Sequence, residues 1–216
     1  MGLIGSLYRS SVGKKSFMAA SGLLLSLFLL THLIGNSISF WGREAYNTYA
    51  EKLHSLGVMV YLFELGLLAL FLLHIITGIF LYFENLRARP ARYAVNTSEG
   101  GRSWGSRTMP YTGVIILVFI IVHLMNFHFI EKTTPVSDLV RNLLSRPGLG
   151  LFYIFALLAV ALHLSHGVWS LFQTIGLNHE KYNGLLLKGS LIFSILVGTV
   201  FILIPLLAIF SRSFLL

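Results

Sequence analysis

Residues 156–176, ALLAVALHLSHGVWSLFQTIG, are apolar enough to lie in a lipid bilayer and yet include two histidines, His163 and His166. A helix needs about 20 apolar residues to cross the hydrocarbon core of a membrane. An ionisable side chain inside such a span is costly and by default marks a functional site. The stretch therefore predicts a membrane helix that carries a chemical function.

The whole chain has the composition of a membrane protein. Of its 216 residues 56% are hydrophobic and 11% are charged, and the mean hydropathy is +0.79. The first apolar run is too long for a signal peptide and has no clear cleavage site, so we expect it to be retained. We expect an all-α membrane bundle, one domain over residues 1–216, with five transmembrane helices at 17–40, 58–83, 111–129, 149–172 and 185–210.

The basic residues predict an orientation. Ten of the 16 Lys and Arg residues lie on the amino-terminal side of the spans and six on the opposite side. Because Lys and Arg are enriched in cytoplasmic loops, we expect the amino terminus in the cytoplasm. This topology and anionic lipid explain the net charge of +8, so we expect no nucleic-acid partner.

Two connections between spans are long. Residues 84–110 are expected on the cytoplasmic side, where their arginines and glycines suit a surface that meets another protein. In the outer connection, residues 130–148, Ser137 is expected to cap a short interfacial helix that Pro147 and Gly148 end. Plain connection is the alternative for both segments.

Histidine occurs in four of the five predicted spans. A single histidine between helices is more simply explained by a hydrogen bond to a carbonyl or hydroxyl group. Four spans with histidine favour a cofactor site, because imidazole is a common axial ligand of haem iron and bundles build such sites from facing helices. The chain has no cysteine, which excludes thiolate-ligated iron–sulfur clusters and c-type haem attachment. Any haem is therefore expected to be b-type.

A weak internal repeat relates the helices in pairs. The sequences SGLLLSLFLLTHL (21–33) and TGVIILVFIIVHL (112–124) both consist of a hydroxyl residue, a glycine, nine further residues and then His-Leu. The sequences HIITG (74–78) and HLSHG (163–167) both place a glycine four residues after a histidine. Gly78 and Gly167 would leave room for a flat porphyrin on the ligand's face, although close helix packing explains them equally well.

Depth along the helices gives the same pairs. At about 1.5 Å per residue, His32 and His123 lie in the outer half of the membrane, whereas His74 and His163 lie in the inner half. Two haems stacked across the bilayer would result, each with two axial imidazoles and no open iron position, which favours electron transfer. Depth alone would match His74 with His166, which is one turn deeper, but the glycine pattern selects His163.

These sequences resemble the dihaem cytochrome b membrane anchors, of the single-anchor type, of bacterial succinate:quinone oxidoreductases and menaquinol:fumarate reductases. The resemblance covers nearly the whole chain and is carried by KKSFMAASGLLLSLFLLTHLIGN, FLLHIITG, TGVIILVFIIVHL and ALHLSHGVWSLFQTIG. In this family each of the first four helices gives one axial ligand, the first pairing with the third and the second with the fourth. The resemblance therefore implies the iron ligands His32, His123, His74 and His163.

The resemblance also implies partners. They are a cytoplasmic flavoprotein that interconverts succinate and fumarate, and an iron–sulfur protein that exchanges electrons with the inner haem. The chain would be a non-flavin subunit of this enzyme complex in a bacterial inner membrane, with menaquinone as its substrate. His166 would then tune the inner haem by bonding a propionate or would contact the partner subunit.

One position departs from the family pattern. Some fumarate-reducing members have a glutamate two residues before the helix-four ligand, and this glutamate is thought to carry protons inward. Ala161 occupies the position here. The resemblance therefore does not carry that proton path over to this chain.

A quinone site needs a proton-handling group within hydrogen-bond reach of a quinone oxygen. The candidates are Glu51, His54 and Glu64. Glu51 and His54 are equally well explained as solvated loop residues, whereas Glu64, a carboxylate inside a span, needs a functional reason. His128 at the outer interface and His179 in a cytoplasmic loop are not expected to bind a cofactor.

Two other functions fit the same pattern. The chain could be the dihaem anchor of another respiratory dehydrogenase, of the hydrogenase or formate dehydrogenase type. Alternatively, a small transporter could use the histidines as proton relays, in which case it would contain no haem. The co-purifying iron–sulfur protein would identify the first, and a spectrum without b-type bands would favour the second.

Overall fold

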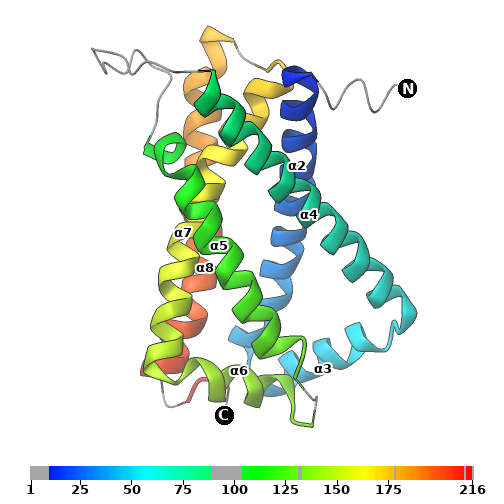
Figure 1. Ribbon diagram of the computed structural model, residues 1–216. Helices are drawn as coiled ribbons and strands as arrows, with labels where there is room; N and C mark the ends of the chain where they lie inside the picture. The colour runs from blue at the N-terminus through cyan, green and yellow to red at the C-terminus, as the bar shows by residue number, and fades with distance from the viewer. Residues whose placement is uncertain (1–9, 89–103, 131–132, 178, 212, 216) are drawn as a thin grey trace.

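The computed structural model describes residues 10–88, 104–130, 133–177, 179–211 and 213–215. Across these residues its regular structure is helical, and five helices are long and apolar enough to cross a membrane. They run alternately up and down between two ends of a bundle (Figure 1). The five predicted spans are thus confirmed, as α2 (Ser11–Ser37), α4 (Val58–Arg87), α5 (Trp104–Phe127), α7 (Pro147–Thr174) and α8 (Glu180–Phe210).

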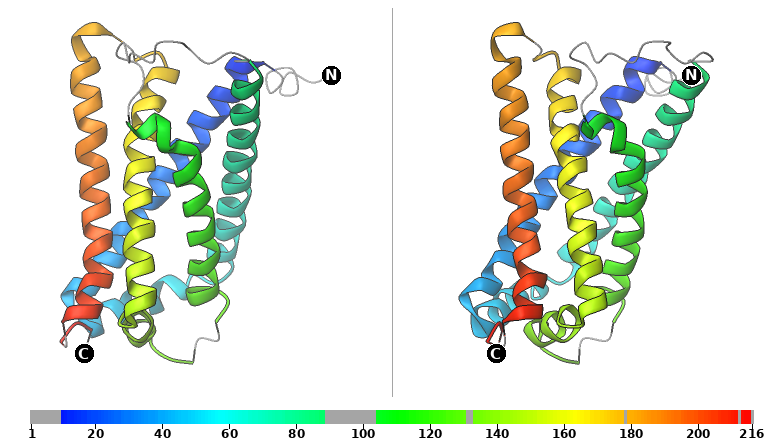
Figure 2. Two further views of the ribbon diagram at one scale, coloured as in Figure 1. Left: turned by 60° about the vertical axis from the view of Figure 1, so that its left-hand side comes forward. Right: turned by 90° about the vertical axis from the view of Figure 1, so that its left-hand side faces the viewer.

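Helix α7 lies at the centre of the bundle. It packs against α8, α5 and α2, whereas α4 packs mainly against α2 at the edge (Figure 2). Where α7 meets α8 the backbones approach closely, since a Cβ added at Gly198 would lie only 2.8 Å from the Cβ of Ala161. Small residues at such contacts let membrane helices pack without a hydrophobic driving force. The structure therefore leaves no room for a longer side chain between α7 and α8 at position 161.

The ends of the helices follow local rules. The hydroxyl of Ser10 accepts a hydrogen bond of 2.9 Å from the backbone N–H of Gly13 and caps α2, as serine commonly does. Nδ1 of His179 likewise accepts from the backbone N–H of Lys181 at 3.2 Å and caps α8. His179, which had no role in the sequence analysis, thus ends the connection between α7 and α8.

Three short elements lie across the end of the bundle opposite the start of α2, here called the far end (Figure 1). They are the 3₁₀ helix η1 (Ile38–Trp41), α3 (Arg43–His54) and α6 (Val136–Leu144). Gly42 (φ 102°) and Gly57 (φ 54°) flank α3. Both have positive φ, which glycine adopts without strain, and this allows the chain to turn into and out of α3.

The short helix expected between the third and fourth spans is present as α6, but its predicted ends are wrong. Pro135, not Ser137, occupies the N-cap position. The Ser137 hydroxyl is buried with no hydrogen-bond partner among the described residues, and its backbone N–H is bonded to Oδ1 of Asn47 at 3.1 Å. The helix ends at Leu144, and Pro147 begins α7, where its missing N–H costs nothing.

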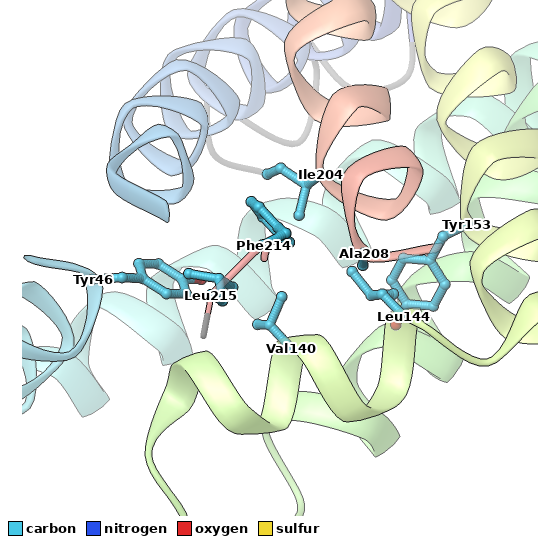
Figure 3. Close-up of a cluster of buried hydrophobic side chains, with 8 residues drawn as sticks. All are labelled: Tyr46, Val140, Leu144, Tyr153, Ile204, Ala208, Phe214 and Leu215. Atoms are coloured by element: carbon cyan, nitrogen blue, oxygen red, sulfur yellow. The ribbon is translucent and has the colours of Figure 1, made fainter. Parts of the chain in front are cut away.

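A hydrophobic cluster closes the far end (Figure 3). It joins α3, α6, α7, α8 and the last described residues through Tyr46, Val140, Leu144, Tyr153, Ile204, Ala208, Phe214 and Leu215. Burial, with a smaller effect of Tyr49, raises the pKa of Tyr46 to about 12, and its hydroxyl donates to Oδ1 of Asn36 at 3.0 Å. An ion pair of 2.7 Å between Arg43 and Asp138 adds a link between α3 and α6.

The α7–α8 contact gives a stability prediction. Gly198→Leu should lower stability by about 1–3 kcal/mol, the usual cost of overpacking, because its side chain would meet Ala161. Thermal unfolding of the purified protein in detergent would measure this. The matched control is Gly189→Leu, because no described atom lies within 4 Å of a Cβ at that position of α8. Equal stability of both variants would contradict the close contact.

Candidate functional site

Two histidine pairs lie at different levels of the bundle. His74 on α4 and His163 on α7 have ring centroids 6.4 Å apart, with ring planes at 65°. His32 on α2 and His123 on α5 have centroids 5.9 Å apart, with planes at 85°. These are the pairs expected from the sequence repeat and from depth.

The His74–His163 pair lies nearer the end where α2 begins, and the His32–His123 pair nearer the far end. The separation follows from Ser21, which contacts His74 and precedes His32 by 11 residues on the same helix. At a rise of about 1.5 Å per residue, 11 residues correspond to about 16 Å. The two pairs are therefore stacked along the bundle axis.

Hydroxyl groups adjoin the His74–His163 pair. Oγ of Ser21 lies 3.0 Å from Nδ1 of His74, and Oγ1 of Thr112 lies 3.1 Å from Nδ1 of His163. The residue after each hydroxyl is a glycine of the sequence repeat. These glycines, Gly22 and Gly113, face the Cε1 atoms of His74 and His163, at 3.4 and 3.8 Å from a Cβ built on each glycine.

Aromatic rings surround the His32–His123 pair instead. Phe28 stacks on His32 at 5.4 Å between centroids, and Phe119 and Phe127 lie beside His123 at 5.7 and 5.2 Å. Nδ1 of His123 is buried and has no hydrogen-bond partner among the described residues. A buried polar atom without a partner is unusual, and the protein alone therefore leaves this histidine incompletely satisfied.

Each histidine pair suits a metal ion whose remaining ligands come from a cofactor and not from the protein. In the described part of the chain no three His, Cys, Asp or Glu side chains gather into a metal site, whereas a bare zinc ion, for example, takes about four ligands. Two imidazoles on opposite sides of one metal ion would have ring centroids about 6 Å apart, since each metal–nitrogen bond is about 2 Å long. Both pairs match this spacing, so the residues fit the axial ligation of two haems.

The other expected haem contacts stay predictions. A Cβ at Gly78 would lie 3.3 Å from Cε of Met18, and one at Gly167 would have no described atom within 4 Å. His166 is half-buried beside the start of α5. A Cβ added at Gly105 on α5 would lie 2.8 Å from the Cβ of His166. The glycines that face the histidine rings are thus Gly22 and Gly113 of the hydroxyl–glycine repeat, not Gly78 and Gly167.

The quinone candidates fall into two groups. Glu51 and His54 are exposed on α3, and Glu51 lines a shallow open hollow at the far end. The carboxylate of Glu64 on α4 lies 3.5 Å from Nδ1 of His128, just beyond the end of α5, and both side chains are 38% exposed. The structure therefore pairs Glu64 with His128, a residue to which the sequence analysis gave no role.

Sequence comparison relates the chain to succinate dehydrogenase membrane subunits. It is 29% identical over 156 residues to the succinate dehydrogenase cytochrome b558 subunit of Bacillus subtilis (strain 168), a match that covers 71% of this chain and 74% of that protein. It is 40% identical over 70 residues to the succinate dehydrogenase hydrophobic membrane anchor subunit of Halobacterium salinarum (strain ATCC 700922 / JCM 11081 / NRC-1), covering 32% of this chain and 53% of that protein.

No family model matches the chain, and no solved structure does. The longer match nevertheless spans most of both proteins. The chain is a homologue of the succinate dehydrogenase cytochrome b558 membrane anchor subunit. This confirms the resemblance drawn from the sequence motifs.

Proposed function

We propose that this homologue of the cytochrome b558 subunit anchors a succinate/fumarate:menaquinone oxidoreductase in a bacterial inner membrane. It carries electrons between menaquinone and a partner iron–sulfur subunit, which together with a flavoprotein sits on the cytoplasmic face. The observation that carries the proposal is the two histidine pairs, with centroid distances of 5.9 and 6.4 Å, at two levels of a membrane bundle.

The four histidines bind two b-type haems, which supply one-electron carriers at two depths. His74 and His163 hold the inner haem, and His32 and His123 hold the outer one. Two imidazoles at each level would hold each haem, which would supply electron transfer rather than oxygen binding. The aromatic side chains beside His32 and His123 keep water away from the outer ligands.

Glu64 and His128 handle protons at the far end. Oxidation of a quinol releases two protons, so a proton acceptor must lie within hydrogen-bond reach of a quinol oxygen. The carboxylate and the imidazole lie 3.5 Å apart, and both are groups that can accept a proton from a quinol oxygen. His128 follows the outer ligand His123 by five residues, so the pair lies about 7 Å beyond that ligand, toward the far end.

With the amino terminus in the cytoplasm, the quinone site lies on the outer side. Four of the ten basic residues that support this orientation lie outside the described residues, namely Arg9, Arg89, Arg92 and Arg102. Most of the 84–110 segment assigned to partner contact also lies outside them. A carboxylate at position 161 would meet α8 at Gly198. We therefore place no proton path there.

Replacement of each ligand tests the assignment. His32→Ala, His74→Ala, His123→Ala and His163→Ala should each reduce the haem content of the purified complex from two to one per complex. The control His128→Ala should retain both, because His128 pairs with Glu64. Pyridine haemochrome assays measure the content. Two haems in all four ligand variants would overturn the assignment.

Glu64→Gln should lower quinol-linked turnover by about 100-fold or more, which is the usual contribution of a general base. Haem content and electron transfer from succinate to a water-soluble dye should stay unchanged. Glu44→Gln, on the exposed start of α3, is the control. If Glu51→Gln lowers turnover and Glu64→Gln does not, the quinone site lies at α3 instead.

The wild-type complex tests the proposal as a whole. A reduced-minus-oxidised spectrum should show b-type bands, and succinate-oxidising or fumarate-reducing activity should co-purify with the chain. A spectrum without b bands would favour a proton transporter. Bands accompanied by a hydrogenase or formate dehydrogenase iron–sulfur protein would assign the anchor to that complex.

A further inference from the structure

We propose that Ser21 and Thr112 are positioning residues for the inner haem, because each hydroxyl accepts the Nδ1 proton of one ligand histidine and directs its Nε2 to the iron. This inference rests on the proposed function. The two contacts, of 3.0 Å to His74 and 3.1 Å to His163, cross between neighbouring helices. Both hydroxyl residues are almost fully buried, with 2% and 4% of their surface exposed.

Backbone carbonyls beside both hydroxyls favour one direction for these hydrogen bonds. A hydroxyl has one proton to donate, and Oγ of Ser21 donates it to the carbonyl of Met18 at 3.1 Å. Oγ1 of Thr112 likewise donates to the carbonyls of Thr108 and Met109 at 3.0 and 3.1 Å. With its proton on a backbone carbonyl, each hydroxyl oxygen is free to accept from the histidine that it contacts. In the proposed arrangement the histidine nitrogen facing the hydroxyl therefore carries the proton.

The tautomer of each ligand follows. A neutral imidazole has one N–H, so protonation at Nδ1 leaves Nε2 with a free lone pair. Outer-shell acceptors of this kind fix the ring orientation of a metal-bound histidine and raise its basicity. Ser21 and Thr112 thus hold His74 and His163 ready for iron through their Nε2 atoms.

Each copy of the sequence repeat contributes residues to both the inner and the outer histidine pair. In each copy the hydroxyl contacts the inner histidine of a neighbouring helix, and the histidine 11 residues later belongs to the outer pair. The glycine after each hydroxyl keeps the space beside the inner imidazole free of a side chain. The hydroxyl residue and the glycine of each copy therefore contact the inner histidine pair, and the histidine of each copy belongs to the outer pair.

The two levels differ in this respect. The inner ligands have hydroxyl acceptors, whereas Nδ1 of His123 has none among the described residues. A more basic ligand stabilises oxidised iron and so lowers the reduction potential. Removing the acceptors should raise the potential of the inner haem and leave the outer haem unchanged.

The test is a spectroelectrochemical titration of the purified holo complex. Ser21→Ala and Thr112→Val should shift the midpoint potential of the inner haem upward, and the double variant should shift it further. The variants that keep a hydroxyl, Ser21→Thr and Thr112→Ser, should restore the wild-type value. The midpoint potential that is missing from the titration of His74→Ala is the potential of the inner haem.

Ser26→Ala is the matched control, because the Ser26 hydroxyl lies on the same helix and bonds the carbonyl of Gly22 at 2.7 Å. It should leave both potentials unchanged. Selective loss of the inner haem in Ser21→Ala or Thr112→Val would also support the proposal, since outer-shell changes typically weaken metal binding about 10–100-fold. Ser21→Cys, which keeps a weak acceptor, should give an intermediate shift if Ser21→Ala does not assemble.

Two haems with unchanged potentials in Ser21→Ala and Thr112→Val would overturn the inference while leaving the haem ligands intact. Loss of both haems in these variants, or an equal shift in Ser26→Ala, would also overturn it by showing a general structural effect. A wild-type complex without b haem would instead contradict the proposed function. The two failures are therefore distinguishable.

Discussion

The cost of burying an imidazole in an apolar bundle is the constraint on which the arrangement depends. Inside a membrane no water is available to satisfy a polar group, so each buried histidine needs a partner on another helix or a bound group. His74 and His163 reach a hydroxyl and each other, and His32 and His123 reach each other within a shell of aromatic rings. These contacts fix which helices face one another and at what height.

The contrast between α7 and α4 shows how two kinds of contact share this work. Helix α7 is held by close packing, as at Ala161 and Gly198, and about 39% of its span is buried. Helix α4 has only 6% of its span buried and is linked to α2 by polar contacts, the ion pair between Lys14 and Glu84 and the bond from His74. Polar side chains thus help to locate a helix that is held by little close packing.

The spans and the histidine pairs were predictable because apolar length and the cost of a buried imidazole are properties of the sequence itself. Other features depend on which residues from distant segments meet. Ser137 has a capping residue's chemistry, but its hydroxyl is buried against the bundle. His128 acquires a partner only because the start of α4 returns to the end of α5, and no sequence period signals that encounter.

The 11-residue spacing between hydroxyl and histidine has an evolutionary consequence. Eleven residues are very nearly three turns of an α-helix, so both side chains project from one face. A single insertion or deletion between them would rotate the hydroxyl by about 100° relative to the histidine. The two side chains could then no longer both face their histidine partners on the neighbouring helices. The lengths of the segments 23–31 and 114–122 therefore cannot change independently of the two histidine pairs, even where their apolar side chains do.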